Sequence, residues 1–271
     1  MWILVLLILF VACAGAFWML WPERKPREPY RGDLDVAIIS LPERKKEFFD
    51  RLASDLAEYQ IRARWAEGIR GKGLPLDQPE ISPKYRQFFE KNRAEFARGE
   101  TTKLYDGHLG CTLTHLREAK HAQGRLLILE DDAILADGFG ALLEKRLQSL
   151  EGKDWDMLVL GLACQYNHSN KCHENDDLPL EHGLTQIKYW FGGWAYLIRD
   201  KAAADKIVKL LTPLHTHFDL SCAEMARTGK LNVYATIPAL VYHPGVLRVD
   251  SFDYTQTGDT RKARYRTDTN A

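Results

Sequence analysis

Three consecutive carboxylates follow an apolar segment near the middle of the chain. Glu130, Asp131 and Asp132 come directly after residues 126–129, which read LLIL. A strand interior does not accept three charged side chains unless something neutralises them. Mg²⁺ and Mn²⁺ prefer carboxylate oxygens, and α/β sheets bind ligands at the carboxyl ends of their strands. The pattern predicts a metal site, and acids that only cap a helix or form a turn with Asp137 are the alternative.

The composition limits the class of partner. The chain has 271 residues, and its 37 basic and 37 acidic residues give a formal net charge of zero. Proteins that bind nucleic acid usually carry a basic excess, so we expect no nucleic-acid partner. A hydrophobic content of 45% is ordinary for a globular protein, and the length suits one large domain.

The first 21 residues form a separate apolar segment. They contain no charged residue, and Trp2, Trp18 and Trp21 lie near the two ends. About 20 apolar residues span a bilayer as a helix, and tryptophans anchor such helices at the interfaces. We therefore expect a single-pass transmembrane anchor at 1–21 and a polar juxtamembrane stalk at 22–33. A cleaved signal peptide is the alternative, but the segment lacks a basic start and continues past its small residues.

The sequence does not decide on which side of the membrane the rest of the chain lies. Arg24, Lys25, Arg27 and Arg31 follow the apolar segment, and no charge precedes it. Positive residues favour the cytoplasmic side, which favours a cytoplasmic catalytic domain over a lumenal one.

The rest of the sequence alternates between strand-like and helix-like periods. Strands are expected at 34–41, 62–66, 126–130, 156–162 and 231–237, and helices at 42–59, 85–96, 110–122, 139–150 and 201–211. Residues 69–103 are rich in Gly, Pro and charge, and we interpret them as an insertion over the sheet edge. This alternation predicts an α/β fold with a mostly parallel sheet and flanking helices over 34–250. A polar tail at 251–271 follows, and we expect it to be frayed from about Arg261.

Five segments, in order, resemble glycosyltransferase family 25. They are 37–44 (AIISLPER), 66–68 (AEG), 107–117 (GHLGCTLTHLR), 127–132 (LILEDD) and 193–198 (GWAYLI). The resemblance implies a GT-A type fold, a Rossmann-like sheet that binds a nucleotide sugar, and metal-dependent transfer with inversion. Members of the family are mostly galactosyltransferases that build lipopolysaccharide outer cores or decorate collagen. Ser40 replaces the usual Asn and Thr114 replaces a Ser, which weakens inferences on donor and acceptor.

Sugar transfer from a nucleoside diphosphate requires neutralisation of the leaving group, which Mn²⁺ or Mg²⁺ bridging both phosphates provides. Glu130 and Asp132, two residues apart, match the Asp-x-Asp arrangement of such transferases. We predict that Asp132 binds the metal, and that Glu130 or Asp131 binds ribose or sugar hydroxyls, with Glu130 a further candidate ligand. His243, after the last strand, is predicted to complete the metal shell as a late His does in GT-A enzymes; a structural His beside Pro244 is the alternative.

Four further residues are candidates for donor binding. Arg44 is predicted to reach a phosphate, and a solvated residue of the first helix is the alternative. Gly107 and Gly110 permit a close approach of backbone to the nucleotide, or form a plain turn before a helix. His115 either faces the sugar or is a packing residue of its helix.

An inverting transfer also needs a base that takes the proton of the acceptor hydroxyl. The segment 217–220 (HFDL) resembles the late Asp-containing segment of the family, so Asp219 is the first candidate and Glu224 the second. An N-cap role for Asp219 is the alternative. Trp190, Phe191 and Trp194 either stack on sugars or pack in the core.

The cysteines leave the redox compartment open. Cys111, Cys164, Cys172 and Cys222 make two bridges or none. Cys164 and Cys172 flank a loop with His168 and His173, where an ordinary loop is the default and a zinc site the alternative.

The predicted function is therefore that of a membrane-anchored hexosyltransferase. It moves a hexose, with galactose from UDP-galactose as first candidate, to a hydroxyl of a glycan, glycolipid or protein. A divalent-metal phosphohydrolase and a non-catalytic relative that binds a sugar nucleotide are the alternatives.

Overall fold

The computed structural model describes residues 28–162, 179–243, 251–254 and 261–263. The predicted anchor at 1–21 and the first half of the predicted stalk, 22–27, lie outside these residues, as does the loop with Cys164 and Cys172. Within the described ranges, no helix combines the length and apolarity that crossing a bilayer requires.

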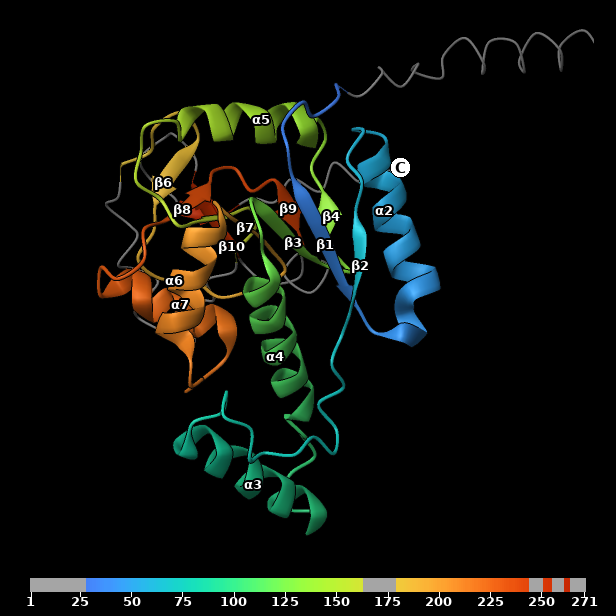
Figure 1. The fold of residues 1–271 in the computed structure, drawn as a ribbon. Helices are drawn as coiled ribbons and strands as arrows, with labels where there is room; N and C mark the ends of the chain where they lie inside the picture. Colours follow the sequence, from blue (N-terminus) through green and yellow to red (C-terminus); the bar gives the residue numbers. More distant parts are fainter. Residues whose placement is uncertain (1–27, 163–178, 244–250, 255–260, 264–271) are drawn as a thin grey trace, which may run out of the picture.

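A seven-stranded sheet forms the centre of the molecule (Figure 1). Its spatial order is β2-β1-β3-β7-β5-β8-β6. The bounds are β1 Asp35–Ser40, β2 Arg64–Glu67, β3 Leu126–Glu130, β5 Met157–Val159, β6 Leu184–Gln186, β7 Ala195–Ile198 and β8 Val233–Thr236. β7 is antiparallel to both β3 and β5, and β6 is antiparallel to β8, whereas the other pairs are parallel. The predicted α/β fold with a mostly parallel sheet is confirmed, with β6 and β7 as the two reversed strands.

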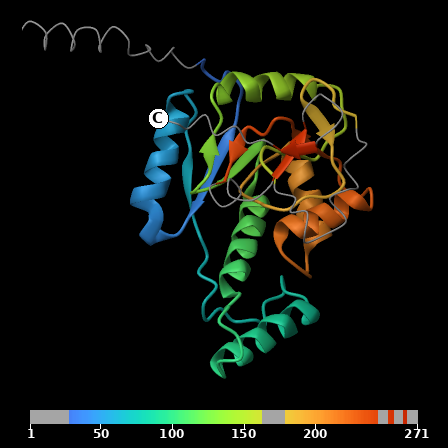
Figure 2. The same cartoon turned by 180° about the vertical axis from the view of Figure 1, so that it is seen from behind.

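Helices cover both faces of this sheet (Figures 1 and 2). Their bounds are α2 Asp50–Ala57, α3 Pro83–Ala97, α4 Asp106–His121, α5 Phe139–Ser149, α6 Lys201–Leu211 and α7 Phe218–Arg227. The expected helix after Pro42 is divided, because the 3-10 turn η1 Pro42–Arg44 and the π-helical segment η2 Lys45–Phe49 precede α2. The expected helix at 110–122 begins four residues earlier, at Asp106.

Alternation along the strands divides the core into two clusters. Along β3, Leu126 and Ile128 pack with residues of α4, α6 and α7, while Leu127 and Leu129 pack with residues of α2 and α5. Successive side chains of a strand point to opposite faces, so a strand covered on both faces is apolar throughout. The apolar segment before the acids is therefore explained by its central position in the sheet.

α3 belongs to the segment that we interpreted as an insertion. It lies clear of the sheet, next to the N-terminal end of α4 (Figure 1). Arg93 of α3 donates to Asp106 of α4 at 2.8 Å, and Asn92 hydrogen-bonds the backbone of Lys103 and Tyr105 at 2.9 Å each. These contacts hold the first turn of α4 in place.

A second, small sheet joins two distant parts of the chain. β4 Ile134–Leu135 pairs antiparallel with β9 Val241–Tyr242, and Ile134 lies opposite Tyr242. This pairing brings the residues that follow β9 next to the acids that precede β4. In the predicted polar tail, β10 Ser251–Tyr254 and β11 Arg261–Ala263 form an antiparallel pair, so this part of the tail is not frayed.

Candidate functional site

The three acids lie where β1 and β3 end side by side. These strands are parallel, and Ile39 lies opposite Glu130. Asp131 is buried, with 4% exposure; Ser40 Oγ donates to its Oδ2 at 2.6 Å, and Arg44 Nη2 lies 2.8 Å from its Oδ1. Burial raises the pKa of Asp131, although Ser40 and Arg44 act in the opposite direction. Both carboxylate oxygens of Asp131 thus already have protein partners.

Asp132 has a different environment. Its Oδ2 lies 3.3 Å from Nε2 of His243 and 3.8 Å from Nη2 of Arg44. Its Oδ1 is buried and has no hydrogen-bond partner among the described residues. Burial acts to raise the pKa of Asp132, but His243 and Arg44 together lower it below its usual value. The hydrogen bond to Asp132 raises the pKa of His243.

Glu130, Asp132 and His243 form a group that can hold a metal ion. One ligand atom of each residue lies within 4.8 Å of the other two. Two carboxylate oxygens and an imidazole nitrogen suit a divalent cation such as Mn²⁺. A buried acceptor without a partner costs free energy, and a cation at this place would satisfy Oδ1 of Asp132. The residues present therefore fit the divalent cation that the sequence predicts.

A cavity of about 190 Å³ opens beside these acids. We call it the strand-edge cavity, because the ends of β1 and β3, the segment 68–71 and the start of α4 line it. Its polar and glycine lining residues include Ser40, Arg44, Arg70, Gly107, Cys111, Glu130, Asp131 and Asp132. Arg44 is half exposed, and Arg70 forms an ion pair with Glu43. The two guanidinium groups give this cavity cationic groups that can bind phosphate.

The two glycines of α4 have different surroundings. A Cβ atom at Gly107 would meet nothing within 4 Å, and Gly107 lines the strand-edge cavity. A Cβ atom at Gly110 would lie 2.1 Å from the carbonyl oxygen of Ile69 and 2.6 Å from the nitrogen of Gly71. Both glycines lie inside the helix, so the alternative of a turn before the helix is wrong. Gly110 permits the segment 69–71 to pack on α4, and nucleotide contact by Gly107 stays a prediction.

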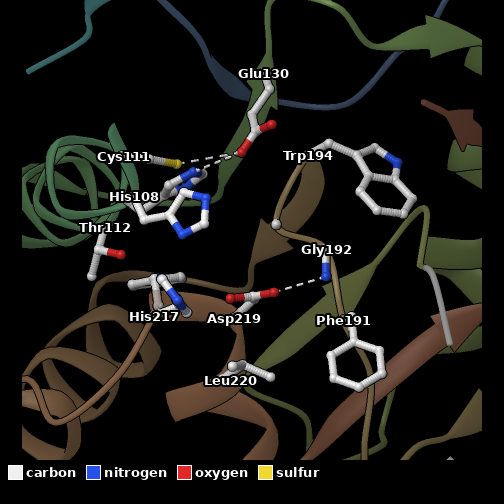
Figure 3. A pocket seen from close by; sticks show the side chains of 13 residues that line it. His108, Cys111, Thr112, Glu130, Phe191, Gly192, Trp194, His217, Asp219 and Leu220 are labelled. Carbon is white, nitrogen blue, oxygen red and sulfur yellow. Dashed lines mark hydrogen bonds and ion pairs between the residues drawn. The ribbon is translucent and has the colours of Figure 1, made fainter. Parts of the chain in front are cut away.

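A second cavity, of about 300 Å³, lies on the other side of Glu130. We call it the aromatic cavity; α4, the segment 191–194 and the start of α7 surround it (Figure 3). Its lining residues are His108, Cys111, Thr112, His115, Glu130, Phe191, Gly192, Gly193, Trp194, His217, Phe218, Asp219 and Leu220. Cys111 and Glu130 line both cavities, so the two cavities meet at the end of β3.

His115 is fixed in the wall of the aromatic cavity. It is 2% exposed, its Nδ1 lies 2.8 Å from the hydroxyl of Tyr196, and its Nε2 lies 3.2 Å from Oε1 of Glu130. Its ring stacks on Phe218 with centroids 5.4 Å apart. Burial raises the pKa of Tyr196 well above its ordinary value, so its hydroxyl stays protonated. His115 is therefore both a packed residue and a cavity residue with one ring nitrogen near Glu130.

Asp219 lies in the first turn of α7 and lines the aromatic cavity. Its Oδ2 accepts a hydrogen bond from the backbone N–H of Gly192 at 2.8 Å, as Figure 3 shows. Gly192 has φ +94°, and a Cβ atom there would overlap the ring of Trp194. The N-cap residue of α7 is His217, without a side-chain cap bond, so the N-cap alternative for Asp219 is wrong. A loop amide holds the carboxylate at the cavity instead.

Glu224, the second candidate base, is placed elsewhere. Five residues along an α-helix correspond to a rotation of about 140° from Asp219. Glu224 accepts hydrogen bonds from Arg227 at 2.6 and 3.0 Å, and it lines neither cavity. The structure therefore does not bring Glu224 to the site, because the helical rotation directs it elsewhere.

The aromatic residues near 190 divide between the two roles that the sequence left open. Phe191 is partly exposed and lines the aromatic cavity. Trp194 also lines it, but it is 4% exposed and packs in the core, with its ring 5.4 Å from that of His243. Trp190 is 2% exposed and packs in the core.

Sequence reasoning missed several contributors to the site. Arg51 donates to the backbone carbonyls of Asp131 and Ala133 at 3.2 and 3.0 Å and so fixes the turn that holds the acids. Tyr196 orients His115, and Cys111 lies between the cavities. The helical spacing of Cys111 and His115 was an available signal, because residues four apart share a helix face. No local signal marks Arg51.

The described cysteines are free thiols. Cys222 is buried, and Cys111 faces the cavities. The alternative of two bridges among four cysteines is therefore wrong. Cys111 is exposed as a residue, but burial around its sulfur raises the pKa of the thiol well above the ordinary value, and the charge of Glu130 acts in the same direction.

Several known proteins are similar to this chain in sequence or in structure. The mouse protein "Procollagen galactosyltransferase 2" is 25% identical over 239 residues, which cover 80% of this chain and 36% of that protein. The rat protein "Probable inactive glycosyltransferase 25 family member 3" is 28% identical over 151 residues, 51% of this chain and 24% of that protein. The chain thus spans about a third or less of these relatives.

A solved structure of UDP-glucose pyrophosphorylase with UDP-glucose aligns with a TM-score of 0.34 and 10% identity, over 74% of this chain and 72% of that chain. A likeness of this size carries no argument. Residues 35–222 match the sequence model described as "Glycosyltransferase family 25 (LPS biosynthesis protein)". Since this match covers more than half of the sequence and agrees with the five segments noted above, the chain belongs to glycosyltransferase family 25.

Proposed function

We propose that this protein is a metal-dependent hexosyltransferase with a GT-A-like domain. The reaction would transfer a hexose, with galactose from UDP-galactose as the first donor to test, to a hydroxyl of a glycan, glycolipid or protein with inversion. The family assignment and the name of the mouse relative support a sugar transfer. One observation carries the proposal. Glu130, Asp132 and His243 converge at the carboxyl edge of the sheet, where two cavities meet.

The strand-edge cavity is proposed to bind the nucleoside diphosphate part of the donor. Arg44 and Arg70 supply positive charge to the phosphates, and Gly107 leaves open space beside them. Glu130, Asp132 and His243 would hold the divalent cation, which when bound neutralises the charge of the leaving diphosphate. Asp131, whose oxygens are occupied by Ser40 and Arg44, holds Arg44 in place rather than binding a sugar.

The aromatic cavity is proposed to bind the hexose and the acceptor hydroxyl. Phe191 offers a partly exposed aromatic face suited to a sugar ring, and Asp219 offers a carboxylate oxygen to the cavity. The N–H of Gly192 fixes the other oxygen of Asp219. Asp219 would take the proton of the acceptor hydroxyl as the hydroxyl oxygen attacks the sugar and the bond between the sugar and the nucleoside diphosphate breaks.

The N-terminal segment 1–21 is proposed as the membrane anchor.

The first experiment is a donor screen across UDP- and GDP-sugars, measured as release of UDP or GDP with and without Mn²⁺ or Mg²⁺. We expect release to require the metal and to fall by at least about 10³-fold in Asp132→Asn, since charge neutralisation by a metal is worth several kcal/mol. Asp205→Asn is the matched control, because Asp205 is exposed and its ion-pair partner among the described residues is Lys201. Full activity of Asp132→Asn would refute the proposal.

The same assay separates the alternatives. Nucleotide hydrolysis that is independent of any acceptor would indicate a phosphohydrolase. Donor binding without turnover across many acceptors would indicate a non-catalytic relative. The rat protein is named as a probable inactive member of the family.

A further inference from the structure

We propose that Cys111, His115 and Glu130 form a second metal site, which takes a thiophilic divalent cation such as Zn²⁺. We further propose that a cation bound there excludes Mn²⁺ or Mg²⁺ from the group of Glu130, Asp132 and His243, because both groups need Glu130. The binding itself is independent of the proposed function, and only the competition rests on it.

Two of the three separations between the ligand atoms already match those of a zinc site, and the third, between Cys111 and His115, is within 4.8 Å. Sγ of Cys111 lies 3.6 Å from Oε1 of Glu130, and Nε2 of His115 lies 3.2 Å from the same oxygen. A tetrahedral zinc ion with bonds of about 2.3 Å to sulfur and about 2.0–2.1 Å to nitrogen and oxygen separates its ligand atoms by about 3.3–3.6 Å. Cation binding at this place therefore needs little movement of the side chains.

The fold also presents the ligands together. Cys111 and His115 are four residues apart on α4 and share one face of the helix, which lies against the end of β3. Figure 3 shows Cys111 pointing towards Glu130 from α4. Both Cys111 and Glu130 line the two cavities, so an ion can enter from either one and solvent can occupy the fourth position.

A partner on the far side of His115 supports the assignment. Nδ1 of His115 lies 2.8 Å from the hydroxyl of Tyr196, which is buried. Histidines that bind metals usually donate their other ring N–H to such a partner, which fixes the ring and the tautomer. With Nδ1 bonded to Tyr196, Nε2 is the nitrogen that faces the proposed ion.

The two groups differ in the cations that they prefer. Glu130, Asp132 and His243 offer two oxygens and one nitrogen, whereas Cys111, His115 and Glu130 offer sulfur, nitrogen and oxygen. Thiolate ligands select zinc over Mg²⁺ and Mn²⁺. Binding requires that the thiol of Cys111 loses its proton to solvent, so zinc binding should release protons.

The binding test uses Co²⁺ as a spectroscopic substitute for Zn²⁺ on the full chain. We expect a thiolate-to-cobalt charge-transfer band in the near ultraviolet, which Zn²⁺ removes and which Cys111→Ser lacks. The band should persist in Asp132→Asn and in the double variant Cys164→Ser/Cys172→Ser. Tyr196→Phe should weaken cobalt affinity by about 10- to 100-fold, as loss of an orienting partner does. No band in the unmodified protein, or a band that persists in Cys111→Ser, would overturn the proposal.

The competition test measures bound Mn²⁺ by electron paramagnetic resonance. Zn²⁺ should displace Mn²⁺ from the unmodified protein. The Zn²⁺ concentration that displaces Mn²⁺ from Cys111→Ser should be about 10- to 100-fold higher. Zn²⁺ should inhibit UDP release in the same order, with each variant compared with its own rate at saturating Mn²⁺. Equal displacement in both proteins would overturn the competition. If no donor supports transfer, the cobalt band still decides the zinc site, so failure of the proposed function remains distinguishable.

Discussion

The two cavities that meet at Glu130 are built in opposite ways. The strand-edge cavity comes from one continuous stretch of chain, 39–132, and its groups are held by charges, as with Arg44 against Asp131. The aromatic cavity combines α4 with residues 191–194 and 217–220, and ring contacts hold it, as with His115 against Phe218. Charge recognition suits a phosphate group, while aromatic faces suit a sugar ring. Mutations in the strand-edge cavity should therefore change mainly the donor KM, and mutations in the aromatic cavity should change mainly kcat.

The largest effect is expected in the aromatic cavity. Asp219→Asn should lower kcat by about 10²–10⁴-fold, the range for loss of a general base, because an amide cannot take the proton. The amide oxygen can still accept the N–H of Gly192, so the loop should keep its position. Steady-state kinetics with the best donor of the screen measures kcat and the donor KM separately.

Glu224→Gln is the control for Asp219→Asn, because Glu224 lies on the same helix but lines neither cavity. It should keep kcat. If Asp219→Asn instead raised only the donor KM, the division of roles between the cavities would be wrong.

A smaller effect is expected in the strand-edge cavity. Arg44→Gln should raise the donor KM by about 10- to 100-fold and leave kcat nearly unchanged, since a hydrogen bond to a charged group is worth about 1.5–3 kcal/mol. Arg98→Gln is the control, because Arg98 is exposed, pairs with Glu100 and does not line the cavity. Arg98→Gln should keep the donor KM of the unmodified enzyme. Equal KM values for both variants and the unmodified enzyme would remove Arg44 from the phosphate site.

The sequence predicts elements that have a local apolar period better than elements that depend on long-range pairing. β3 and α6 have the expected bounds, because their apolar periodicity is a local property. The acids after β3 were located by the same local reasoning, since charge at the end of an apolar strand demands an explanation. Ser40, noted only as a departure from the family, is the hydrogen-bond donor to Asp131.

Long-range pairing limits the prediction elsewhere. His243 reaches Asp132 only because β9 pairs with β4, 108 positions earlier at the Ile134–Tyr242 pair, and each strand has two residues. Strands that short carry no usable period. The antiparallel position of β7 between β3 and β5 is likewise a property of the whole sheet, and the contact of Tyr196 with His115 follows from it.

The two glycines of α4 test where the strand-edge cavity ends. Gly110→Ala should lower the free energy of unfolding by about 1–3 kcal/mol, the usual cost of overpacking, because backbone atoms of Ile69 and Gly71 occupy the place of its methyl group. In a domain of this size that corresponds to a fall in Tm of roughly 2–4 °C for each kcal/mol. Gly107→Ala, with open space around it, should leave Tm unchanged or slightly raised. Equal Tm values for the two variants would show that segment 69–71 does not pack on α4.

The smallest effect concerns the pH dependence of stability at the mouth of the aromatic cavity. Burial and the nearby ring of His108, 4.8 Å away, lower the pKa of His217 below 6.5, although the charge of Asp219 acts in the opposite direction. Tyr85 is a further neighbour, with its hydroxyl 3.4 Å from Nδ1 of His217. The unfolded chain therefore binds more protons than the folded one as pH falls through 6.5, and folding loses stability there.

His217→Gln should thus reduce the difference in Tm between about pH 7.5 and about pH 5.5, since the variant has no imidazole to protonate on unfolding. Thermal unfolding at a series of pH values measures this difference. His215→Gln is the matched control, because His215 is exposed and should leave the pH dependence as it is. A pH dependence that is the same in all three proteins would mean that protonation of His217 costs the fold nothing. The aromatic cavity would then tolerate a charged imidazole beside Asp219, and its contrast with the strand-edge cavity would be one of shape rather than charge.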